Sequence, residues 1–170
     1  MQMYSIGVVC HLGMKGTAAS LIPLVLAKDG ENEARKIADK LFVWGAITGL
    51  VIGIGQMVAL PFLVPLFSTL PEVQDAVKMP ALISAFIQVL NGPGFAGEGI
   101  LLGLGKYNTL SAITMLGASL MVGGLYSPLG AGLNGILLSI GSFSACSSIS
   151  MLFHHLKVGP LRRSREMRNA

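Results

Sequence analysis

Apolar residues dominate five long stretches of the chain, and shorter polar stretches separate them. Crossing the hydrocarbon core of a bilayer takes about 20 apolar residues in a helix, and the stretches are close to or above that length. The run from Tyr107 to Leu156 contains no Asp, Glu, Lys or Arg, and its one natural break, YSPLGAG, divides it into two spans. The pattern therefore predicts five transmembrane helices, at about residues 4–27, 41–67, 79–105, 109–127 and 130–156.

The composition favours helices in a membrane over a soluble domain. Of the 170 residues, 52% are hydrophobic and only 12% are charged, whereas a soluble domain usually carries about 25% charged residues. The stretches do not alternate polar with apolar residues, as the roughly 10-residue strands of an outer-membrane barrel do. Helices, in contrast, satisfy their own backbone groups in lipid. We therefore expect an all-α, polytopic transmembrane helix bundle over residues 1–156, surrounded by the lipid bilayer.

Basic residues alternate between the two ends of the predicted helices. The first loop, KDGENEARKIADK, contains several of them, the second, STLPEVQDAVK, contains only Lys78, and the third contains Lys106. The tail, residues 157–170, is again rich in arginine. Because basic residues concentrate on the cytoplasmic side, we expect the first loop, the third loop and the C-terminus in the cytoplasm. The tail is interpreted as a topology anchor, and no nucleic-acid partner is expected.

Small residues recur at four-residue spacing within the predicted spans, at Gly45, Gly49 and Gly53 and again at Gly99 and Gly103. In lipid no hydrophobic force drives helices together, so the close approach of backbones through small residues is a major means of association. We expect these five glycines to pack helices against one another.

The cluster NGPG places Pro93 in the middle of the third span. Proline has no backbone N–H and tends to kink a helix. The cluster therefore predicts a local irregularity with free carbonyl groups, which a membrane protein tolerates only where protein or water lines the backbone.

Charged residues inside the spans are the main candidates for function. Glu98 lies in the inner part of the third span, and Lys15 lies near the middle of the first, one turn after His11. A charge at mid-membrane costs about 2.5–3.5 kcal/mol on insertion scales, and such residues often mark ion or substrate pathways. Glu98 is either a proton or cation relay or a carboxyl group that hydrogen-bonds a neighbouring helix. Lys15 is either a buried functional residue or reaches an aqueous cavity along its aliphatic stem.

Three segments, taken in order, carry a resemblance to a known family. ASLIPLVLAKDGENEARKIADKLFVWG contains a span end, a polar loop and a basic helix start, and FSTLPEVQDAV has the form of a short outer loop. NGPGFAGEGILLGLGKYNTL has a carboxylate–glycine pair before a GxG helix end, which Lys106 follows. Together they resemble the multidrug and toxic compound extrusion (MATE) transporters, in particular the DinF-type branch, from about residue 15 to residue 156. In that family an acid usually follows the GxG, so Lys106 is a departure from its pattern.

The resemblance implies a twelve-helix transporter with two lobes, in which these five spans are helices eight to twelve. The N-terminal lobe and the seventh helix are then missing, and the chain is a fragment. The function implied is an antiporter that exports organic cations or metabolites by alternating access, driven by Na⁺ or H⁺ and with no other cofactor. In this lobe of such a transporter, a carboxylate helps to bind the coupling ion or the substrate. The resemblance places that carboxylate either at Glu98 or at the position that Asn91 occupies in this chain. Gln88 and Lys15 are further candidates for ion or substrate binding.

Other functions stay open at the level of sequence. A lipid-linked oligosaccharide flippase of the same superfamily is expected to carry several basic residues in its lumen, and only Lys15 qualifies. A non-transporting membrane protein would assemble through its faces of small residues. No enzyme and no metal site are expected, because neither a nucleophile with its base nor a metal cluster can be assembled from these residues.

Overall fold

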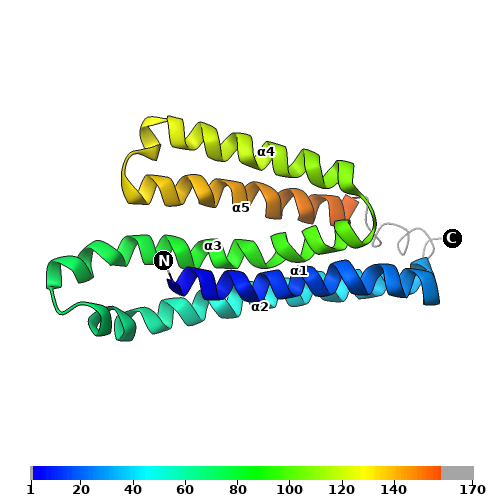
Figure 1. Ribbon diagram of the computed structural model, residues 1–170, viewed down its shortest axis with the longest axis horizontal. Helices are drawn as coiled ribbons and strands as arrows, with labels where there is room; N and C mark the ends of the chain where they lie inside the picture. The colour runs from blue at the N-terminus through cyan, green and yellow to red at the C-terminus, as the bar shows by residue number, and fades with distance from the viewer. Residues whose placement is uncertain (1, 158–170) are drawn as a thin grey trace.

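The computed structural model describes residues 2–157, which form long α-helices joined by short turns (Figure 1). In chain order the elements are α1 (Gln2–Asp29), α2 (Glu31–Phe67), α3 (Pro71–Gly103), α4 (Tyr107–Tyr126), the 3-10 turn η1 (Pro128–Gly130) and α5 (Gly132–Lys157). The all-α prediction is confirmed over the described residues. All five α-helices are long and apolar enough to cross a membrane. The basic tail from residue 158 onward lies outside the described residues.

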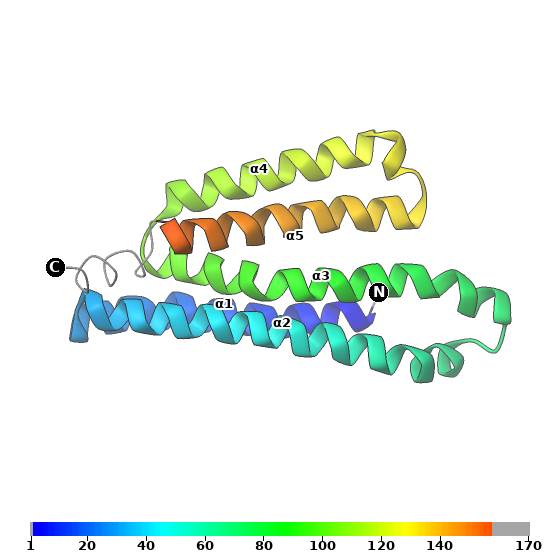
Figure 2. The same ribbon diagram turned by 180° about the vertical axis from the view of Figure 1, so that it is seen from behind.

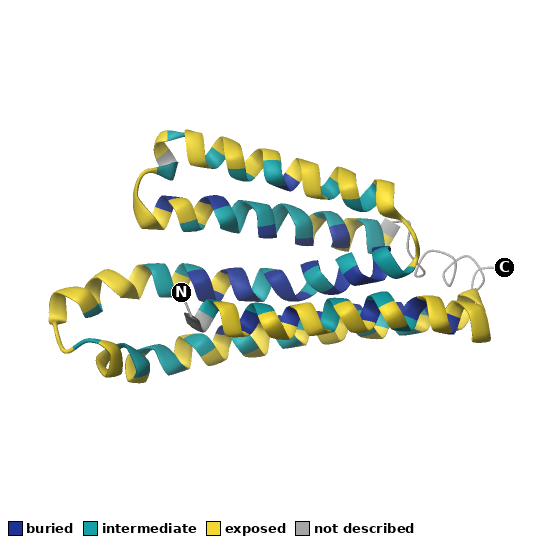
Figure 3. Cartoon of the chain, in the orientation of Figure 1, coloured by how far each residue is buried: buried dark blue, intermediate teal, exposed yellow. Residues whose placement is uncertain are grey.

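Helix α3 is the centre of the bundle. It packs against α1 and α2 on one side and against α5 on the other, and α4 packs mainly on α5 (Figures 1 and 2). Buried residues concentrate on α3 and on the faces that meet it, whereas α2 and α4 have broad exposed faces (Figure 3). Those faces include large apolar side chains such as Trp44, Phe62 and Met115. Soluble proteins rarely expose apolar surface on this scale, so these faces fit the hydrocarbon core of a bilayer.

Two helices begin two turns or more before the spans expected from hydropathy. Helix α2 starts at Glu31 rather than near residue 41, and α3 starts at Pro71 rather than near residue 79. In the first turns of α2, Glu31 forms an ion pair with Arg35. Pairs at this spacing support a helix in water. The polar stretch before each apolar span therefore belongs to the helix, and hydropathy marks only where the apolar part of the helix begins.

Glycines with a positive φ lie in the two turns at one end of the bundle. Gly30, with φ 83°, is the single residue between α1 and α2, and Gly105, with φ 68°, follows α3. The N–H of Gly105 donates to the carbonyl of Leu102 at 3.0 Å, and the N–H of Lys106 donates to that of Leu101 at 2.9 Å. This is a Schellman motif. It explains the GxG helix end and fixes the backbone of Lys106 beside α3.

Glycines also bring α2 and α3 into close contact. A Cβ atom on Gly49 would lie 2.9 Å from the carbonyl oxygens of both Gln88 and Val89, well inside the normal separation of non-bonded heavy atoms. Gly45 and Gly53 lie one turn to either side and face the same helix. The two backbones therefore approach through residues without side chains, as is common for helices in lipid.

The irregularity predicted for the NGPG cluster is not observed, because α3 runs unbroken through it. Pro93 cannot donate a hydrogen bond to the carbonyl of Val89, four residues earlier, but that carbonyl faces Gly49 of α2. On the other side, the hydroxyl of Ser148 in α5 donates to the carbonyl of Leu90. Neighbouring helices thus cover the backbone around the proline, and the helix does not open.

Candidate functional site

An ion pair joins α1 to α3 in the apolar part of the bundle. Nζ of Lys15 lies 2.6 Å from Oε1 of Glu98, although 83 positions separate them in the chain. Their side chains are 27% and 28% exposed, so the pair is accessible from outside the bundle. The two charged residues singled out in the sequence are each other's partners. Each therefore lowers the cost of placing the other in lipid.

Glycines on α3 explain how closely α1 can approach. A Cβ atom on Gly99 would lie 2.8 Å from Cβ of Ala18 and 3.0 Å from Cα of Lys15. Gly103, one turn further along, faces α1 in the same way. A larger residue at either position would push α1 outward. The absence of side chains here lets the Lys15 ammonium reach the carboxylate one residue before Gly99.

Gln88 is the centre of a second polar contact between α1 and α3. Its side chain is 0% exposed. Its Oε1 lies 3.1 Å from Nε2 of His11, and its Nε2 donates to the backbone carbonyl of Tyr4 at 2.8 Å. With the Gln88 oxygen as acceptor, Nε2 of a neutral His11 carries the proton. Nδ1 of His11 is buried and has no hydrogen-bond partner among the described residues.

Asn91 lies beside Tyr4 and not beside Glu98. Its Nδ2 is 3.3 Å from the hydroxyl oxygen of Tyr4, and the residue is buried. One turn further along α3, the ring of Phe95 stacks on that of His11, with centroids 5.8 Å apart. Residues three and four positions apart share one face of a helix. The face of α3 that meets α1 therefore contains Gln88, Asn91, Phe95 and Glu98.

We call this contact the α1–α3 polar interface; it consists of Tyr4, His11, Lys15, Gln88, Asn91, Phe95 and Glu98. Sequence reasoning missed Tyr4 and Phe95 as members of it. The position of Phe95, four residues after Asn91 and three before Glu98, places it on the same helix face. No comparable signal exists for Tyr4, because its role depends on where α1 lies along α3.

The α1–α3 polar interface suits exchange of a cation at a carboxylate. The Glu98 carboxylate can accept hydrogen bonds and can form an ion pair with a cation. The Lys15 ammonium is one such cation. A proton or a metal cation on Glu98 would release Lys15 to another acceptor. About a quarter of each side chain is exposed, so the pair is not sealed inside the bundle.

Comparison with protein-family models, curated proteins and solved structures finds no match to the chain. The resemblance to MATE transporters therefore stays a prediction, together with the missing lobe that it implies. The fold itself shows an all-α protein whose five long helices fit a multi-pass membrane protein.

Proposed function

We propose that the chain forms one lobe of a secondary active transporter, an antiporter that exports small organic cations or metabolites in exchange for Na⁺ or H⁺. The observation that carries the proposal is the Lys15–Glu98 ion pair inside the apolar part of the bundle. Ionisable residues in this setting are costly, and they are typical of ion and substrate pathways. The partial exposure of both side chains supports a site that exchanges ligands rather than a sealed structural pair.

Lys15 acts in this proposal as an internal counter-ion. In one state its ammonium occupies the Glu98 carboxylate and holds α1 against α3. When Na⁺ or H⁺ binds Glu98, the attraction for Lys15 is lost and the contact between α1 and α3 weakens. The coupling ion thereby favours a second arrangement of the helices, and alternating access follows from the difference in its affinity for the two states.

A specific observation favours a second candidate, a non-transporting membrane protein. Glu98 already has a cationic partner at 2.6 Å, and the glycines beside it allow tight contact between α1 and α3. In that case the ion pair only fastens α1 to α3. The flippase alternative has no comparable support, since the α1–α3 polar interface contains one lysine, Lys15, and no arginine.

Ion-dependent binding by the purified chain separates the two candidates. The probe is ethidium, a fluorescent organic cation, titrated into the detergent-solubilised protein with Na⁺ or choline as the salt and at several pH values. A transporter lobe binds ethidium with an affinity that changes with Na⁺ or pH, and Glu98→Gln removes this dependence. Lys78→Gln, at an exposed ion pair with Asp75, serves as the control and keeps it. Binding that does not depend on Na⁺ or pH, or a dependence that survives Glu98→Gln, contradicts the transporter proposal.

A further inference from the structure

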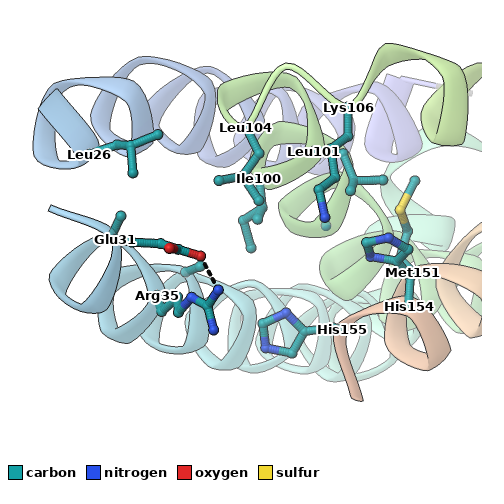
Figure 4. A pocket seen from close by; sticks show the side chains of 13 residues that line it. Leu26, Glu31, Arg35, Ile100, Leu101, Leu104, Lys106, Met151, His154 and His155 are labelled. Carbon is teal, nitrogen blue, oxygen red and sulfur yellow. Dashed lines mark hydrogen bonds and ion pairs between the residues drawn. The ribbon is translucent and has the colours of Figure 1, made fainter. Parts of the chain in front are cut away.

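A cavity of about 130 Å³ lies among four helix ends, where α1, α3 and α5 end and α2 begins (Figure 4). We call it the Lys106 cavity. Lys15 and Glu98 are not among the residues that line it, so it is separate from the α1–α3 polar interface. Its lining contains five charged or titratable side chains: Glu31, Arg35, Lys106, His154 and His155.

Three of these five side chains already have partners. Arg35 forms an ion pair with Glu31, drawn as a dashed line in Figure 4. Nε2 of His155 lies 2.8 Å from Oδ1 of Asp39, and its ring stacks on that of Phe42 with centroids 4.7 Å apart. The single acid in the lining is therefore neutralised, and His155 is held in place by α2.

The side chains of Lys106 and His154 have neither an acidic partner nor a hydrogen bond among the described residues. The Lys106 side chain reaches into the cavity, and the ring of His154 lies close to it (Figure 4). The charge of Lys106 acts repulsively on a protonated His154. The Schellman motif at the end of α3 holds the Lys106 backbone in place. An uncompensated ammonium beside an imidazole is an arrangement that attracts an anion.

We propose that the Lys106 cavity binds an anionic phosphate group, with the Lys106 ammonium and the His154 imidazole as its donors. Charge-assisted hydrogen bonds from cationic side chains are among the strong ones that hold phosphate. The volume accommodates on the order of four water-sized groups, which suits the oxygens of one phosphate group.

The apolar part of the lining indicates which kind of molecule carries the phosphate group. Leu26, Leu104 and Met151 border the cavity beside the charged groups. A phospholipid headgroup carries glycerol and acyl chains next to its phosphate, and basic pockets between transmembrane helices bind such headgroups. The same two donors can also bind a soluble phosphate ion. The phosphate group is the shared chemistry, and its source is a separate question for experiment.

Thermal unfolding of the full chain in a neutral maltoside detergent tests the proposal. The additives are short-chain phosphatidylglycerol, short-chain phosphatidylcholine, inorganic phosphate, and sodium chloride at matched ionic strength. The melting temperature rises with phosphatidylglycerol and not with phosphatidylcholine or sodium chloride. A rise with inorganic phosphate as well shows that the free group suffices, whereas a rise with phosphatidylglycerol alone identifies the lipid as the source. No rise with either anionic ligand overturns the proposal.

Substitutions then locate the binding. Lys106→Gln lowers the affinity about tenfold, as expected for the loss of one charge-assisted hydrogen bond, and Lys106→Arg, which keeps the charge, restores it. Lys106 is exposed, so the glutamine leaves the core intact, which circular dichroism checks. His154→Asn weakens binding independently, and Lys78→Gln, at the other end of the bundle, changes nothing. Equal affinities in the Lys106→Gln and Lys78→Gln variants, or loss of binding only when the arginines of residues 158–170 are neutralised, overturn the proposal.

Discussion

Lys15 on α1 and Glu98 on α3 form a 2.6 Å ion pair that is about one-quarter exposed. Each charge by itself is costly in the hydrocarbon core, so the pair fastens the two helices together. Any movement that separates α1 from α3 leaves two unpaired charges, unless another ion neutralises one of them. Neutralising either charge is therefore expected to weaken the contact between α1 and α3.

Removing one member of this pair is expected to destabilise the protein. Lys15→Gln and Glu98→Gln each leave one charge without its partner, and we expect each to lower the free energy of unfolding by about 1–3 kcal/mol. The double variant is expected to be less destabilised than the sum of the two single variants. Equilibrium unfolding in mixed micelles of dodecyl sulfate and maltoside measures this coupling.

The Lys78–Asp75 pair is the matched control for this cycle. It has the same 2.6 Å separation, but its side chains are 66% and 72% exposed. Surface pairs of this kind contribute about 0–1 kcal/mol. A coupling between Lys15 and Glu98 no larger than that between Lys78 and Asp75 would show that the interhelical pair does not fasten α1 to α3.

Two glycines on α2 are expected to respond to alanine with opposite signs. Gly49→Ala places a methyl group 2.9 Å from backbone oxygens of α3, and overfilling of this kind costs about 1–3 kcal/mol. Gly55, on the same helix, has open space at its Cβ position. Gly55→Ala is therefore expected to stabilise by up to about 1 kcal/mol through helix propensity. Thermal unfolding of both variants checks this, and equal shifts would contradict the close contact of α2 with α3.

The buried amide of Gln88 is expected to hold the N-terminal half of α1 in place. Gln88→Leu removes its bonds to His11 and to the Tyr4 carbonyl, and leaving buried polar groups unpaired costs about 1–3 kcal/mol. Hydrogen–deuterium exchange followed by mass spectrometry should show faster exchange in the first half of α1, with α4 and α5 unchanged. Thr17→Ala is the control, since the Thr17 hydroxyl bonds only within its own helix. Similar exchange in both variants would remove the role assigned to Gln88.

The side of the membrane on which each turn lies can be read by cysteine labelling. The α1–α2 and α3–α4 turns lie at one end of the bundle, and the α2–α3 turn lies at the other (Figure 1). In a background with Cys10 and Cys146 replaced by serine, we introduce Glu33→Cys, Asn108→Cys and Glu72→Cys. A membrane-impermeant maleimide added to intact cells is expected to modify only position 72, because basic residues favour the cytoplasmic side for the other end. Modification of position 33 or 108 under the same conditions would reverse the orientation.

The number and type of the helices could be predicted from the sequence alone. Lipid offers no hydrogen bonds to the backbone, so a long apolar stretch must form a helix whatever its neighbours are. The four-residue spacing of Gly45, Gly49 and Gly53 likewise indicates a contact face before any partner is known. The starts of α2 and α3 could not be predicted from hydropathy, because hydropathy detects only the apolar part of a helix. Helix α2, for example, has charged turns before its apolar part begins.

The partners of the polar residues were decided only by the tertiary structure. Lys15 and Glu98 are both conspicuous in the sequence, but their pairing depends on how α1 lies along α3, which Gly99 and Gly103 permit by close approach. The unbroken course of α3 through Pro93 likewise depends on two neighbouring helices that cover its backbone. Local sequence determines a helix because its hydrogen bonds are local. It does not determine which distant side chain meets a buried charge, because that contact is made by the packing of whole helices.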